Sequence, residues 1–150
     1  MNSNPSKNVQ YVVPKRLRAL KKTKQPRGRV FVDIAPEDHS LAQDIAKKLA
    51  AAGMDVEVFG KERKGGPKQL ESAAAIVRKS DAAVFLLTPN SLRSDWMLAE
   101  LGLAMGRELP VIAIMAGIDR VAVPAPFWGK EVVSFDQLDN VVARLSREKT

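Results

Sequence analysis

Apolar and polar positions follow two periodicities that alternate along most of the chain. Short apolar runs or strict apolar and polar alternation predict strands near residues 30–33, 54–59, 82–87, 111–115 and 131–135. The segments between most of these strands repeat apolar residues at helical spacing, while residues 117–130 are irregular and rich in proline. Strands that alternate with helices indicate an α/β fold with one doubly wound parallel sheet.

The helical segments have recognisable ends and faces. The first presents Leu41, Ile45 and Leu49 on one side and is closed by Gly53. The second begins near Pro67, and the last is expected to be capped by Asp136. Their predicted buried faces comprise Leu70, Ala73, Ala74 and Val77 in the second helix and Leu138, Val141, Val142 and Leu145 in the last.

The central stretch, residues 81–102, is a strand followed by a polar turn and a helix. Its unbroken apolar run predicts a strand that is buried on both faces and ends at Pro89. Ser94 suits the N-cap of the next helix, in which Trp96 and Glu100 share one face. A carboxylate therefore lies beside an indole near the start of a helix.

The expected strand order is 2-1-3-4-5, as in flavodoxin-like sheets. This order places the topological switch between the first and third strands, where open α/β sheets bind their ligands. Residues 33–38 and 88–100 would then face one crevice, which makes Glu100 the first candidate for a functional residue.

Several common occupants of such a crevice are excluded by missing motifs. The chain has no G-x-G-x-x-G after the first strand, no Gly-Lys-Ser/Thr phosphate loop and no G-x-S-x-G elbow. Thr88 stands where a phosphoacceptor aspartate would lie, and the single histidine, His39, lacks partners for a metal site. We expect no metal and no bound cofactor.

The net charge of +7 comes from the N-terminus. Residues 1–28 hold eight of the 24 Lys and Arg residues and none of the 17 acidic residues, so the remainder is nearly neutral. This composition predicts a basic, flexible arm, which could bind an acidic partner, nucleic acid or anionic lipid, followed by one domain over residues 29–150. The basicity is therefore no argument that the domain binds nucleic acid.

Cysteine is absent, and the longest apolar run, residues 109–118, is shorter than the ~20 residues of a membrane helix. No segment has the order of a signal peptide. We expect a soluble, cytoplasmic protein without a membrane span.

The residues also carry a resemblance to a known family. Val30-Phe-Val, Glu37-Asp38, Gly65-Gly66, Leu87-Thr-Pro-Asn90 and above all the W-x-x-x-E element of residues 96–100 resemble a Toll/interleukin-1 receptor (TIR) domain of the bacterial type. The resemblance covers residues 29–135 and implies the same five-stranded parallel sheet. It also implies that the chain assembles through TIR–TIR contacts, and that it acts in prokaryotic immune signalling or defence.

Many members of this family hydrolyse the nicotinamide–ribose bond of NAD with the glutamate that matches Glu100. The chemistry suits a single carboxylate, because nicotinamide leaves as a neutral group that needs no general acid. Glu100 would bind the ribose hydroxyls and stabilise the developing positive charge, with Trp96 as a wall. The resemblance implies NAD as substrate, and leaves open ADP-ribose or a cyclic form as product.

The other candidate residues lie in two loops. After the first strand, Asp33, Ile34 and Ala35 would line the substrate, although related domains commonly have Ser followed by His or Tyr there. In the loop after the second strand, Arg63 would meet the pyrophosphate. The resemblance makes this loop the assembly loop, with the residues Lys61, Glu62, Arg63, Lys64, Gly65 and Gly66.

Two alternatives remain open on the sequence. One is a non-catalytic TIR interaction module in which Glu100 is structural, either solvated or paired with Arg107. The other is a nucleoside or nucleotide N-ribosyl transferase.

Overall fold

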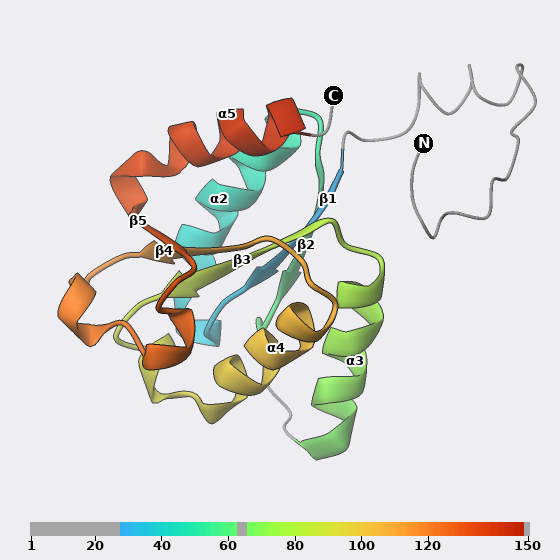
Figure 1. Cartoon of the computed structure of the whole chain (residues 1–150), viewed down its shortest axis with the longest axis vertical. Helices are drawn as coiled ribbons and strands as arrows, with labels where there is room; N and C mark the ends of the chain where they lie inside the picture. The colour runs from blue at the N-terminus through green and yellow to red at the C-terminus, as the bar shows by residue number, and fades with distance from the viewer. Residues whose placement is uncertain (1–27, 63–65, 149–150) are drawn as a thin grey trace, which may run out of the picture.

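The computed structural model describes residues 28–62 and 66–148, in which five strands form one sheet (Figure 1). The order is β2-β1-β3-β4-β5 and every neighbouring pair is parallel, as predicted. The strands are β1 (Arg29–Asp33), β2 (Asp55–Phe59), β3 (Ala82–Leu87), β4 (Val111–Met115) and β5 (Glu131–Ser134).

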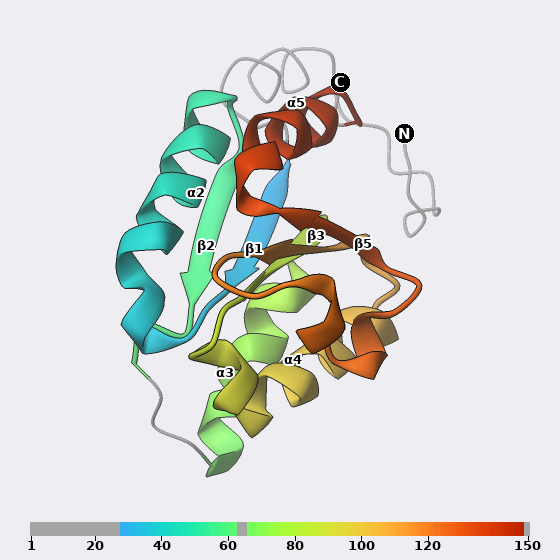
Figure 2. The same ribbon diagram turned by 90° about the vertical axis from the view of Figure 1, so that its left-hand side faces the viewer.

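In the described part of the chain, four helices cover the two faces of this sheet. Helices α2 (His39–Ala51) and α5 (Leu138–Glu148) lie together on one face, and α3 (Gly66–Arg78) and α4 (Asp95–Gly106) lie on the other (Figure 2). Short 3-10 turns join several elements, including η1 (Pro36–Asp38) after β1 and η2 (Ser91–Arg93) before α4.

The core is divided by the alternation of side chains along the strands. Val30 and Val32 of β1 belong to the apolar cluster under α2 and α5, whereas Phe31 belongs to the cluster under α3 and α4. Strand β3 is buried at all six positions, with Phe85 on the α3–α4 side and Leu86 on the other. A central parallel strand buried on both faces explains the unbroken apolar run in the sequence.

Some element ends differ from the prediction. Strand β2 begins at Asp55, because the Met54 amide still donates to the Leu49 carbonyl of α2. Strand β5 ends at Ser134, and residues 135–137 form a 3-10 turn before α5. Asp136 lies inside that turn and accepts a hydrogen bond from the Ser134 hydroxyl, so it does not cap α5 as predicted.

The buried face of α3 also differs. Its buried residues are Gln69, Ala73 and Val77, while the predicted Leu70 and Ala74 are only half-buried. The buried residues of α3 are therefore spaced four apart, and the first of them, Gln69, is polar.

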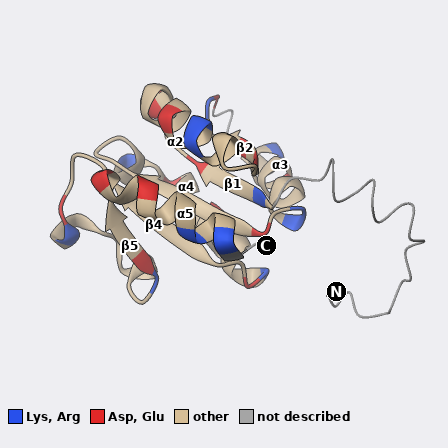
Figure 3. Ribbon diagram, turned by 90° about the horizontal axis from the view of Figure 1, so that it is seen from above, with Lys and Arg blue, Asp and Glu red and all other residues tan. Residues whose placement is uncertain are grey.

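Helices α2 and α5 carry charged residues of both signs, which colour their ribbons blue and red in Figure 3. The basic arm, residues 1–28, lies outside the described residues except for Gly28. In the described part of the chain, no helix is long and apolar enough to cross a membrane.

Candidate active site

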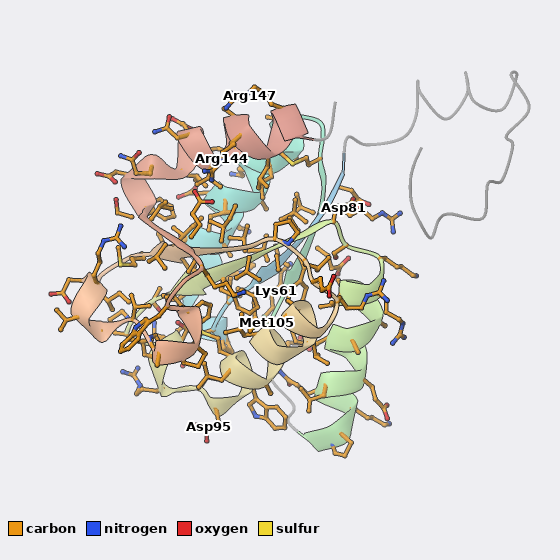
Figure 4. All side chains as sticks on the ribbon, viewed as in Figure 1. Lys61, Asp81, Asp95, Met105, Arg144 and Arg147 are labelled. Carbon is orange, nitrogen blue, oxygen red and sulfur yellow. The ribbon has the colours of Figure 1, made fainter. Side chains whose placement is uncertain are left out.

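Helix α4 begins at the carboxyl end of β3, as the sequence predicts. Ser94 occupies its N-cap position but forms no side-chain cap, and its buried hydroxyl has no hydrogen-bond partner among residues 28–62 and 66–148. Asp95 points outward from the first turn, and Figure 4 labels it at one end of α4 with Met105 near the other. Trp96 is half-buried one turn before Glu100.

Glu100 is fully buried, with 0% of its surface exposed. Its Oε2 atom accepts a hydrogen bond of 2.9 Å from Nε2 of Gln69, which comes from the first turns of α3. The prediction that Glu100 faces an open crevice is therefore wrong for this state of the molecule. The solvated position considered for it is excluded as well, and Arg107 donates instead to the carbonyl of Arg78 at 3.2 Å.

Hydrogen bonds among the chain's own side chains cross the topological switch between β1 and β3. The carboxylate of Asp38 accepts a hydrogen bond from the Thr88 hydroxyl and one of 2.9 Å from the Asn90 amide. The Thr88 Oγ1 also accepts from the backbone amides of Asn90 and Ser91, each at 3.1 Å. This network, Asp38 with residues 88–91, joins the loop after β1 to the turn before α4.

A hollow lies instead at the carboxyl end of β2, beside the start of α3. It has a volume of about 310 Å³ and is lined by Phe59, Glu62, Lys68, Gln69 and Ser72. Phe59 offers an aromatic face, Lys68 a cation, and the other three residues hydrogen-bonding groups. Glu100 does not line this hollow but lies behind Gln69.

The residues predicted to line the substrate after β1 are buried. Asp33, Ile34 and Ala35 each expose 2% of their surface or less. Ile34 packs in the cluster under α2 and α5, on the opposite face of the sheet from α4. Because strand side chains alternate, Asp33 shares the α3–α4 face with Phe31 and therefore lies on the same side as Glu100. Their proposed contacts with substrate stay predictions.

The predicted assembly loop is described in part. Lys61 and Glu62 are exposed, and Gly66 opens α3 with φ +75°, a conformation that favours glycine. Arg63, Lys64 and Gly65 lie outside the described residues.

Gln69 is the residue that sequence reasoning missed. A signal existed, because Gln69 precedes the buried Ala73 and Val77 by four and eight residues, on the same helical face. The apolar pattern alone points to the neighbouring Leu70, which is only half-buried.

Among residues 28–62 and 66–148, no group of three His, Cys, Asp or Glu side chains could hold a metal ion. The described side chains of the site are thus carboxylate, amide, hydroxyl, ammonium and aromatic groups.

Comparison with known proteins agrees with the fold. A family model described as "TIR domain" matches residues 30–146. The TIR domain of the Toll-related Receptor TRR-2 from Hydra magnipapillata has 19% identity and a TM-score of 0.60, with 80% of this chain and 96% of that chain covered. No curated protein matches the chain in sequence.

A metazoan TIR-STING receptor from C. gigas, solved in complex with 2',3'-cGAMP, has 18% identity and a TM-score of 0.60. The match covers 81% of this chain but only 40% of that receptor's length. At these identities the solved structures show the shared fold, whereas the family model spans more than three quarters of the sequence. The chain therefore belongs to the TIR domain family.

Proposed function

We propose that this TIR domain hydrolyses the nicotinamide–ribose bond of NAD, with Glu100 as the catalytic carboxylate. The observation that carries the proposal is the placement of Glu100 on α4, fully buried, within 2.9 Å of a donor whose own side chain lines a hollow. A carboxylate in a water-poor site stabilises nearby positive charge far more strongly than one in bulk water.

The reaction balances with water as the only other reactant. The bond between C1' of the ribose and the pyridinium nitrogen breaks, and its electron pair leaves with nicotinamide, which becomes neutral. Water adds to C1' and loses a proton, giving ADP-ribose; attack by another group of the same molecule would give a cyclic product. Glu100 would accept hydrogen bonds from ribose hydroxyls and offset the charge that develops at C1'.

The hollow beside Gln69 supplies groups that suit such a substrate. Phe59 can pack against a flat heterocycle, and Lys68 can approach the pyrophosphate. We place the substrate at this end of β2 because the hollow lies there, while the Asp38 carboxylate at the switch point is hydrogen-bonded to Thr88 and Asn90.

We also propose that copies of the chain assemble and that cleavage depends on assembly. TIR domains self-associate, and the hollow is bordered by Glu62 of the predicted assembly loop. Replacing Gly66 by Val strains a position with φ +75° and should reduce both self-association in light scattering and NAD cleavage. Unaltered association would place the contact elsewhere. A cytoplasmic role in prokaryotic immune signalling or defence is part of the same proposal.

The test is nicotinamide release from NAD by the purified full chain at several protein concentrations. The proposal expects release that rises more than in proportion to protein concentration and is lost in Glu100→Gln. A matched control is Glu108→Gln, which changes an exposed glutamate just after α4. No release from the parent protein at any concentration would refute it.

One observation favours a second candidate, the non-catalytic TIR interaction module. Glu100 is fully buried and hydrogen-bonded, as a structural side chain would be. This candidate predicts that the protein releases no nicotinamide and that it binds a partner through the assembly loop.

A further inference from the structure

Gln69 separates Glu100 from the hollow. Its side chain lines the hollow, is itself only 6% exposed, and donates through Nε2 to the Glu100 carboxylate at 2.9 Å. Since Glu100 is fully buried, a molecule that enters the hollow meets the Gln69 amide before it meets the carboxylate.

We propose that the Gln69 side chain controls the access of substrate to Glu100. The inference rests on the proposed function, in which Glu100 must touch the ribose. In the described arrangement the amide occupies the position from which a substrate would reach Oε2. Cleavage then requires the Gln69 side chain to turn away, and only the fraction of molecules in that state binds substrate productively.

The chemistry of the exchange favours a polyhydroxylated ligand. The Gln69 amide gives Glu100 an N–H donor, and a ribose hydroxyl would give it an O–H donor in the same place. When the ribose hydroxyl replaces the Gln69 amide, the buried carboxylate therefore still accepts a hydrogen bond at that position. A ligand without hydroxyl groups offers no such replacement and should open the site poorly.

Access can be measured without any catalytic reaction, because the chain contains no cysteine. Glu100→Cys introduces a unique thiol and removes the acceptor of the Gln69 amide, so its rate of reaction with N-ethylmaleimide reports whether the bulk of the Gln69 side chain covers position 100. We expect a slow rate, close to that of the buried control Ala104→Cys and far below that of the exposed control Ala99→Cys. Adding Gln69→Ala should raise the rate of Glu100→Cys at least tenfold.

The matched variant Gln69→Met keeps the bulk of the side chain without its amide and should leave the Glu100→Cys thiol slow. Equal rates with Gln69 and with Gln69→Ala would overturn the proposal, as would a Glu100→Cys thiol that already reacts as fast as Ala99→Cys. If Gln69→Ala lowers the melting temperature strongly, the same measurement can be made with Gln69→Ser, whose side chain is polar but much shorter than that of Gln69.

The native carboxylate gives an independent measurement. With NAD as substrate, Gln69→Ala should raise kcat/KM several-fold through a lower KM, because more molecules are open. A fall in kcat/KM in a folded Gln69→Ala protein would overturn the proposal, since it would make Gln69 a positioning residue for Glu100. If the parent releases no nicotinamide, the proposed function fails, and the thiol rates still decide whether Gln69 covers position 100.

Discussion

Replacing Glu100 by Gln separates the charge of this side chain from its shape. The carboxylate is fully buried and accepts from Gln69 Nε2 at 2.9 Å. A glutamine at position 100 can turn its carbonyl oxygen toward the same donor, so that hydrogen bond is retained. The substitution Glu100→Gln also removes a buried group whose charged form is more stable in water than in the protein interior. We expect the free energy of unfolding to change by no more than about 1 kcal/mol.

Glu100→Ala should behave differently. It leaves the Gln69 donor without its acceptor, which costs about 1–3 kcal/mol, and removes a buried methylene worth roughly 0.8 kcal/mol. With the cavity that remains, the loss is about 2–4 kcal/mol. At about 2–4 °C per kcal/mol for a chain of this size, the melting temperature should fall by roughly 4–16 °C, against about 4 °C or less for Glu100→Gln.

The catalytic effect should not follow this order. If the charge of Glu100 stabilises the reacting centre, Glu100→Gln lowers the rate about 10²–10³-fold, or ~3–4 kcal/mol, despite its small effect on stability. Nicotinamide release and thermal melting on the same samples test both statements. Full activity in Glu100→Gln, with release confirmed in the parent, would refute the role of Glu100 and direct attention to Asp33, on the same face of the sheet.

Three further predictions concern stability. Glu108 has φ +58° just after α4, so Glu108→Gly should raise the free energy of unfolding by about 0.5–1 kcal/mol, whereas Glu71→Gly inside α3 should lower it by about 1 kcal/mol. Thr88→Val removes a donor to Asp38 and an acceptor for two backbone amides, and denaturant unfolding should show a loss of about 2–3 kcal/mol. Deleting residues 1–27, which keeps the Gly28 carbonyl that accepts from the Asp55 amide at 2.8 Å, should leave the melting temperature nearly unchanged, and a drop of many degrees would show that the arm docks on the domain.

The fold could be predicted because its determinants are local. The unbroken apolar run at residues 82–87 marks the central strand, and the order of strands and helices leaves few topologies once crossovers are right-handed. Gly53, with φ +91°, ends α2 where the sequence placed its cap. Element ends were less certain, since hydrogen bonds such as that of the Met54 amide to Leu49 depend on neighbouring segments.

The site could be predicted only in part. Periodicity places Glu100 on α4, but its hydrogen-bond donor is Gln69, 31 residues earlier in another helix. Likewise, Asp38 and Thr88 were expected at one crevice, but whether they would bind a ligand or one another depends on side-chain geometry. Local spacing can indicate that Gln69 faces inward, but it does not indicate which distant residue Gln69 contacts.

The outer edge of β2 bears on how copies of the domain can meet. This strand pairs only with β1 among the described residues, and its exposed positions are Asp55 and Glu57. Asp55 is paired with Arg29 at 3.1 Å, so the Glu57 carboxylate is the charge that a second copy's β2 would bring beside its own counterpart, and like charges on facing strands repel. Growth of a continuous, irreversible β-sheet is thereby disfavoured. Copies would associate instead through loops and helix surfaces, where contacts form and dissociate as the protein concentration changes.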